Sequence, residues 1–259
     1  MKSDKLITVV IPTKNRPVFL EKSVACFLGW RRFLDLVVVD DGSSKEFSER
    51  NEKITKGKCE YYKLNKSMGS SFARNFGFEK RINKFVWFFD DDDMVGSATI
   101  YSLISLLKTG LDEDVILLPM EIIRSSISER VVTPTKEKNN YDAYRKELHQ
   151  VNTSCTVIKS DVFLESGKWD ENLVAGQDTD LFLRLSLLSK YKCLETEPVK
   201  IYTDHEDRIT VNKKKQHKAI LQFLIKNWYL ISWKRRASYI KSYIKTLPVL
   251  LKILNKENK

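Results

Sequence analysis

A run of apolar residues that ends in four consecutive acids constrains this chain most strongly. In NKFVWFFDDDDMVG, residues 83–96, five apolar residues (Phe85–Phe89) are followed directly by four aspartates (Asp90–Asp93). A short run rich in aromatic and β-branched residues is typical of a strand buried on both faces. Adjacent carboxylates repel one another unless some bind protons or a cation neutralises them. The segment therefore predicts either a solvated turn or a divalent-cation site where a buried strand ends.

The first 120 residues alternate strand-like and helix-like segments, which predicts an α/β fold with a mostly parallel central sheet and helices on both faces. The predicted strands are Leu6–Pro12, an apolar run that begins at Leu34 and ends in the acids Asp40 and Asp41, and the segments Glu60–Leu64, Phe85–Phe89 and Asp114–Met120. In such sheets ligands bind beyond the carboxyl ends of the strands. Two of these strands end in clustered aspartates, so both clusters should face one crevice. This placement favours a ligand site over solvated turns.

The middle of the chain is less regular. Ser125–Gln150 is polar and weakly periodic, which predicts a long loop or an insertion. Ala175–Leu188, with the sequence AGQDTDLFLRLSLL, predicts a helix that carries Asp178 and Asp180 in its first turn. Either acid could stabilise the helix N-terminus, so a capping role for Asp178 stays open beside a catalytic one.

The charge is concentrated at one end of the chain. The whole sequence carries 45 Lys/Arg against 34 Asp/Glu, a net +11. Residues 212–259 contain 13 Lys/Arg and a single acid, Glu257, so they carry +12 and residues 1–211 carry −1. This distribution argues against a nucleic-acid-binding core. It predicts two parts, a near-neutral body at 1–211 and a basic, amphipathic helical segment at 212–259.

The basic segment has an amphipathic pattern. On a helix beginning at Ile240, apolar residues share one side and lysines occupy another arc, and the preceding stretch, residues 223–236, is aromatic. We expect it to lie on an anionic membrane surface, although it could instead pack on its own domain. Four dispersed cysteines, no signal-peptide pattern and no apolar run long enough to cross a bilayer predict a cytoplasmic protein, peripheral on the inner face of the membrane.

Five motifs in a fixed order resemble the family 2 glycosyltransferases of bacterial O-antigen, capsule and lipooligosaccharide assembly, which have the GT-A fold. The motifs are VVIPTKNRP (9–17), VVVDDGSS (37–44), GSSFARNFG (69–77), FFDDDDM (88–94) and GQDTDLFLRL (176–185). The resemblance covers about residues 6–210 and leaves the basic tail outside. It implies a metal-dependent inverting enzyme that uses Mn²⁺ or Mg²⁺. Such an enzyme would move a hexose or N-acetylhexosamine from a UDP-sugar to a glycan acceptor, which we expect to be lipid-diphosphate-linked.

The resemblance also implies roles for individual residues. Asp178 matches the catalytic base, and a positioned carboxylate can remove the proton of an acceptor hydroxyl. The expected nucleotide-binding residues are Pro12, Thr13, Asn15, Arg16, Asp41 (at the uracil ring), Arg74, Asp90 and Asp91. The expected metal ligands are Asp92, Asp93 and His205, with Arg208 at the diphosphate. Two positions depart from the family pattern, because Gln177 replaces a common Glu and Ser67 replaces a common Asn.

Other functions fit the residues less well. A sugar-phosphate nucleotidyltransferase or a nicotinamide dehydrogenase should have a glycine-rich phosphate loop after the first strand, and IPTKNRP has no glycine. A phosphotransfer domain with an aspartyl nucleophile would leave Asp90–Asp93 and Asp178 unused. A non-catalytic module that binds sugar nucleotides remains the alternative from another class.

Overall fold

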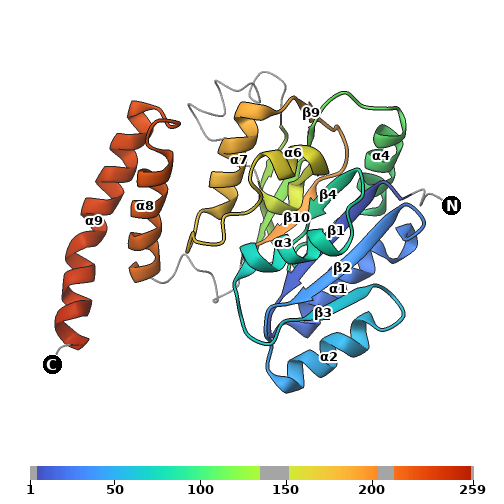
Figure 1. Cartoon of the computed structure of the whole chain (residues 1–259), viewed down its shortest axis with the longest axis horizontal. Helices are drawn as coiled ribbons and strands as arrows, with labels where there is room; N and C mark the ends of the chain where they lie inside the picture. The colour runs from blue at the N-terminus through green and yellow to red at the C-terminus, as the bar shows by residue number, and fades with distance from the viewer. Residues whose placement is uncertain (1–4, 135–151, 204–212, 258–259) are drawn as a thin grey trace.

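The computed structural model describes residues 5–134, 152–203 and 213–257, and Figure 1 shows a central sheet flanked by helices with two C-terminal helices along one side. Within these residues the main sheet has seven strands in the order β3-β2-β1-β4-β8-β5-β9. The strands are β1 (Ile7–Thr13), β2 (Leu34–Asp40), β3 (Glu60–Lys63), β4 (Phe85–Phe88), β5 (Val115–Leu117), β8 (Thr156–Lys159) and β9 (Tyr191–Cys193). Strands β3, β2, β1 and β4 are mutually parallel, and β8 is antiparallel to both β4 and β5. The predicted mostly parallel α/β sheet is confirmed.

Helices cover both faces of this sheet. Their bounds are α1 (Pro17–Phe27), α2 (Lys45–Thr55), α3 (Ser70–Lys80), α4 (Ser97–Lys108), α6 (Ser160–Glu165) and α7 (Gln177–Leu188). Alternate residues of β1 enter different cores: Val9 packs with α1 and α4, and Val10 packs with α3, α6 and α7. Gly77 lets α3 approach the sheet closely, because a Cβ at this position would lie 2.5 Å from Cγ1 of Val10. The strands are therefore buried on both faces, as their unbroken apolar runs predict.

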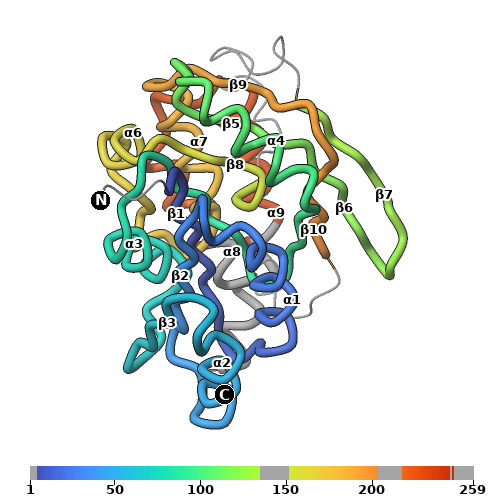
Figure 2. Tube along the Cα trace, turned by 90° about the vertical axis from the view of Figure 1, so that its right-hand side faces the viewer, coloured from blue at the N-terminus to red at the C-terminus, as the bar shows by residue number. Residues whose placement is uncertain are grey.

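Two predictions for the middle of the chain were wrong in detail. Asp114–Met120 is not one strand, because the chain leaves the main sheet at Pro119, which has no N–H to donate, and continues as β6 (Met120–Arg124) in a small sheet of order β10-β6-β7. Part of the expected loop Ser125–Gln150 is β7 (Ile127–Val132), which Figure 2 shows projecting as a hairpin with β6. Residues 135–151 lie outside the described residues. Strand β10 is Val199–Tyr202.

The hairpin escaped prediction for a physical reason. Ser125 and Ser126 both have positive φ, at 50° and 62°, which is the backbone of a tight two-residue hairpin turn that usually contains Asn or Gly. Five of the six β7 residues are exposed, so no alternation of buried and exposed residues marks the strand. Main-chain pairing with β6 holds it in place.

The basic segment forms two helices, α8 (Lys213–Asn227) and α9 (Trp233–Glu257). The second helix begins seven residues before the predicted start at Ile240. Phe223, Leu224 and Ile231 are buried in the same core cluster as α6 and α7. In Figure 1, α8 lies between α9 and α7, with the central sheet beyond α7. No helix in the described part of the chain combines the length and the apolar character that a membrane crossing needs.

Candidate active site

The carboxyl ends of β1, β2 and β4 bring three predicted segments to one edge of the sheet. Thr13, the last residue of β1, is in register with Asp40 at the end of β2, and Val10 is in register with Phe88 near the end of β4. The loop after β1, the turn after β2 and the four aspartates after β4 therefore meet at this edge, as the parallel topology predicts.

The two acids after β2 have different environments. Asp40 is fully buried and accepts hydrogen bonds from the Ser43 backbone N–H (2.7 Å), Asn51 Nδ2 (2.9 Å) and Tyr61 Oη (2.7 Å). These partners satisfy the carboxylate and fix the turn that begins α2. Asp40 therefore has a structural role.

Asp41 binds the loop that leads into α3. Its carboxylate accepts hydrogen bonds from Ser67 Oγ (2.7 Å) and from the backbone N–H groups of Met68 (2.6 Å) and Gly69 (3.0 Å). Gly42 beside it has φ 72°, and a Cβ there would lie 2.5 Å from Ser67 N. Ser67, one of the two departures from the family pattern, thus supplies a hydroxyl that holds Asp41 in place.

The loop after β1 packs against both acidic segments. Asn15 has φ 57°; its N–H donates to Ser43 Oγ (2.8 Å) and its Oδ1 accepts from Ser44 N (2.9 Å). Thr13 Oγ1 donates to Asp91 Oδ2 at 2.6 Å, and Arg16 Nη1 lies 3.4 Å from Asp91 Oδ1 and 3.2 Å from Asp92 Oδ2. Pro12 lies within β1, in register with Val39 of β2.

The four aspartates after β4 divide into two sets. Asp91 turns toward Thr13 and Arg16. Oxygen atoms from Asp90, Asp92 and Asp93 all lie within 4.8 Å of one another. Asp92 and Asp93 are two of the metal ligands that the sequence predicts, and Asp90, which was expected at the nucleotide, joins them in this group. A grouping of carboxylate oxygens at this spacing suits a hard divalent cation such as Mg²⁺ or Mn²⁺.

Ser154 supports this cluster, although no sequence pattern predicted it as a site residue. Its hydroxyl donates to Asp93 Oδ2 at 2.6 Å and accepts from the Asp90 backbone N–H at 2.9 Å. The fully buried side chain comes from a short 3₁₀ turn, Thr153–Cys155, immediately before β8. This turn lies in a segment with little periodicity, and only the pairing of β8 with β4 brings it to the acids.

Burial changes the protonation of the cluster. The pKa of Asp91 is raised to about 7, mainly by burial and also by the charges of Asp92 and Asp90, against lowering by Thr13 and Arg16. Burial also raises the pKa of Asp93 well above its usual range, with the charges of Asp90 and Asp92 acting in the same direction. A bound cation favours the charged forms of such acids and so lowers the pKa values that burial has raised. The residues therefore fit the divalent metal that the sequence predicts.

Arg74 connects the acidic cluster to Trp169, in the segment between α6 and α7. Its Nη2 lies 2.5 Å from Asp90 Oδ1, and its guanidinium carbon lies 4.7 Å from the centre of the Trp169 ring. Asn75 holds that tryptophan, because its Nδ2 donates to Trp169 O (2.9 Å) and its Oδ1 accepts from Trp169 N (3.1 Å). Trp169 and Asn75 were not predicted, since neither pattern nor charge distinguishes them from core residues.

Asp178 lies in the first turn of α7. The residue that precedes this helix is Gly176, in the left-handed conformation at φ 73°, so Asp178 is not the N-cap. Its Oδ1 accepts from the Thr179 backbone N–H at 2.7 Å. Burial raises the pKa of Asp178. The charge of Arg74 lowers this pKa and the charge of Asp90 raises it, so both groups interact electrostatically with Asp178. His205 and Arg208 lie outside the described residues.

Solved structures share this fold. The chain aligns with a crystal structure of S. aureus TarS 1–349 in complex with UDP-GlcNAc at a TM-score of 0.68, with 14% identity over 93% of this chain and 72% of that one. A mannosyltransferase from Pyrobaculum calidifontis in complex with GDP-Man and Mn²⁺ aligns at a TM-score of 0.59, with 13% identity over 86% of this chain and 64% of that one. These likenesses establish the GT-A fold.

Sequence relatives agree with the structural ones. The chain is 24% identical to the minor teichoic acid biosynthesis protein GgaB of Bacillus subtilis over 95% of its own length and 28% of that protein. It is 29% identical to the GalNAc(5)-diNAcBac-PP-undecaprenol beta-1,3-glucosyltransferase of Campylobacter jejuni over 40% of its own length and 35% of that protein. It thus spans about a third of the length of these relatives. The sequence pattern of glycosyl transferase family 2 matches residues 8–166, from β1 to the end of α6, and the chain belongs to this family.

Proposed function

We propose that this protein is a metal-dependent, inverting glycosyltransferase that moves a hexose or N-acetylhexosamine from a UDP-sugar to a glycan acceptor. The observation that carries the proposal is the meeting of two acidic groups at one edge of the sheet. Asp90, Asp92 and Asp93 group their oxygens within 4.8 Å, and the partly buried Asp178 is near enough to Arg74 and Asp90 for their charges to shift its pKa.

In this proposal Asp178 is the general base. Its raised pKa suits a carboxylate that accepts the proton of an acceptor hydroxyl, because a base is most effective when its pKa approaches the working pH. One base without a nucleophilic carboxylate gives a single displacement, which inverts the anomeric carbon. Gln177, the other departure from the family pattern, donates from Nε2 to Leu173 O at 3.0 Å and so braces the start of α7.

The remaining residues would bind the donor. Asp90, Asp92 and Asp93 would hold Mn²⁺ or Mg²⁺, with His205 as a further ligand and Arg208 at the diphosphate. When bound, the cation would supply positive charge that stabilises the leaving diphosphate. Pro12, Thr13, Asn15, Arg16, Asp41, Arg74 and Asp91 would line the nucleotide pocket, with Asp41 beside the uracil ring. Uracil is supported by the UDP-GlcNAc in TarS, although the GDP-Man in the other neighbour shows that the fold accepts either base.

The acceptor is proposed to be a lipid-diphosphate-linked glycan at the inner face of a bacterial membrane. The name of the Campylobacter relative specifies an undecaprenol diphosphate substrate, and that of the Bacillus relative specifies teichoic acid synthesis. Helix α9 adds an independent observation. Its apolar residues Trp233, Ile240, Ile244 and Leu247 are between 36% and 71% exposed.

The flank of this stripe is cationic. Lys234, Lys241 and Lys245 are exposed along the same helix. A helix with exposed apolar residues beside lysines binds anionic bilayers through both apolar burial and charge attraction. Replacing Ile240, Ile244 and Leu247 with serine should reduce binding to vesicles that contain phosphatidylglycerol. Undiminished vesicle binding by this triple variant would remove the membrane from the proposal.

The catalytic proposal is tested by donor turnover. A panel of UDP-sugars with Mn²⁺ identifies the donor as the one that raises the melting temperature most, because a ligand selective for the native state stabilises it. UDP release from that donor should need the cation and stop with EDTA. In the variant Asp178→Asn, turnover should fall by at least about a thousandfold while the donor still raises the melting temperature. Wild-type turnover in this variant would exclude Asp178 as the base, and a donor that binds without any turnover would indicate a non-catalytic module.

A further inference from the structure

Helix α8 contacts the segment that carries Asp178. The helix itself lies outside residues 8–166, which match the family. On its inner face, Gln222 and Lys226 are one turn apart, and Asn227 follows. Gln222 Nε2 donates to Asn172 O at 3.1 Å, and its Oε1 accepts from Val174 N at 3.3 Å. Gln222 therefore binds the loop that enters α7.

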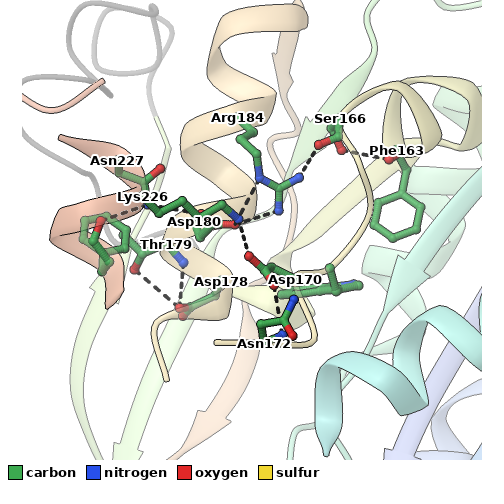
Figure 3. Close-up of polar contacts among 12 residues, drawn as sticks. Phe163, Ser166, Asp170, Asn172, Asp178, Thr179, Asp180, Arg184, Lys226 and Asn227 are labelled. Atoms are coloured by element: carbon green, nitrogen blue, oxygen red, sulfur yellow. Dashed lines mark hydrogen bonds and ion pairs between the residues drawn. The ribbon is translucent and has the colours of Figure 1, made fainter. Parts of the chain in front are cut away.

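Lys226 and Asn227 bind the same segment at two further points. Lys226 Nζ lies 2.5 Å from Asp170 Oδ2 and 3.0 Å from Asp180 Oδ2, so one ammonium joins the loop after Trp169 to the first turn of α7. Asn227 Nδ2 donates to Asp180 Oδ1 at 3.1 Å. Figure 3 shows the contacts of Lys226 and Asn227 converging on Asp180, with Asp178 two residues closer to the helix N-terminus. We name Gln222, Lys226 and Asn227 the α8 clasp.

Asp180 makes these contacts energetically important. Its side chain is fully buried, and a buried carboxylate is costly unless it is paired and hydrogen-bonded. Arg184 supplies two hydrogen bonds to Oδ2 from the same helix, at 3.0 Å and 2.8 Å. Among the hydrogen bonds of the described residues, Asn227 alone donates to Oδ1. Arg184 pairs with Asp180 from within α7, and α8 completes the set of partners by adding a second cation and the donor to Oδ1.

Apolar packing gives the clasp a rigid support. Phe223 and Leu224 of α8 are buried in one cluster with Leu181, Phe182 and Leu185 of α7. On the other side of the loop, Trp169 stacks beneath Arg74, the partner of Asp90. Segment 170–180 is therefore held between the nucleotide side of the site and α8.

We propose that α8 is a positioning element of the active site, in which Gln222, Lys226 and Asn227 set the place of Asp178 relative to the bound donor. This inference rests on the proposed role of Asp178 as the base. Within the described residues the clasp makes no hydrogen bond or ion pair with Asp178, so it acts through the backbone of the 170–180 segment. A general base displaced by about 1 Å can lose about a hundredfold in rate.

The test uses the full chain with the double substitution Gln222→Ala and Lys226→Met, and follows UDP release from the donor selected above with Mn²⁺. We expect kcat to fall at least about tenfold while KM for the donor changes less than about twofold, because donor contacts are untouched. Lys218→Met is the matched control, since it removes the same charge from an exposed site two turns earlier on α8. It should leave kcat unchanged. Lys226→Arg keeps a cation between Asp170 and Asp180 and should retain most of kcat.

A second readout does not depend on turnover. Backbone amides of residues 171–180 should exchange hydrogen faster in the double variant and at the wild-type rate in Lys218→Met, because the clasp restrains that segment. Unchanged kcat and unchanged exchange in the double variant would overturn the inference, as would equal losses in kcat and donor affinity together with a lowered melting temperature. Asp178→Asn separates the two proposals: full activity in that variant refutes the base itself, whereas full activity in the double variant refutes only its positioning by α8.

Discussion

Acidic residues cluster at two places in this protein, after β4 and at the start of α7. The two clusters have different electrostatic environments. At the end of β4, buried carboxylates crowd one another, and burial raises the pKa of Asp91 and Asp93. In the first turn of α7, Asp180 is completely buried yet compensated by Arg184, Lys226 and Asn227. Asp178, two residues away, forms no ion pair within the described part of the chain, and burial raises its pKa. Compensated acids stabilise the fold, whereas uncompensated buried acids are available to a ligand or a proton.

The comparison predicts a large effect on stability for one acid of α7 and a small effect for the acid two residues away. Asp180→Ala should lower the free energy of unfolding by about 3 kcal/mol, because removing one partner leaves Arg184, Lys226 and Asn227 without their shared acceptor. Asp178→Asn should change it by no more than about 0.5 kcal/mol, since the amide keeps the acceptor for Thr179 and removes a charge that burial disfavours. Urea unfolding of both variants measures the difference. Equal losses in the two would show that both acids are structural.

A good part of this site was predictable from the sequence, because the acids follow apolar strands and parallel topology brings strand ends together. Asp90, Asp92 and Asp93 are grouped as the pattern indicated. Ser154 and Trp169 were not predictable in the same way, because antiparallel β8 and the loop before α7 reach the site through long-range pairing that leaves no local periodicity. Similarly, the basic composition of α8 is typical of a surface helix, and only the structure shows that Lys226 pairs with Asp170 and Asp180.

The buried Asp91 after β4 predicts that the stability of the protein depends on pH. The pKa of Asp91 is raised from 3.8 to about 7, so between these values the native state holds a proton that the unfolded chain releases. Without a divalent cation, stability from this group is present at low pH and is lost as pH rises toward 7. From pH 5.5 to 7 the loss should reach about 2 kcal/mol.

Thermal or urea unfolding in EDTA across pH 5.5–8 measures this slope, and Asp91→Asn is the control that should flatten it. Mn²⁺ should stabilise the protein more at pH 8 than at pH 5.5, because a cation competes with protons for the carboxylates. A stability that rises with pH in EDTA to the same extent in both proteins would show that Asp91 ionises as readily as an exposed acid. The β4 acids would then no longer stand apart as uncompensated.

A substitution at Ser154 tests whether the acids after β4 are positioned for the fold alone or also for a metal ion. Ser154→Ala removes the donor to Asp93 and the acceptor of the Asp90 N–H, so it should cost about 1–2 kcal/mol of stability. It should also weaken Mn²⁺ binding at least about tenfold, because outer hydrogen bonds orient metal ligands. Thr156→Val is the matched control: it removes a buried hydroxyl from the same segment that donates to Asn152 O at 3.0 Å and touches no acid. Calorimetric titration with Mn²⁺ compares the two, and if both variants bound the cation as tightly as the wild type, Ser154 would serve the fold alone.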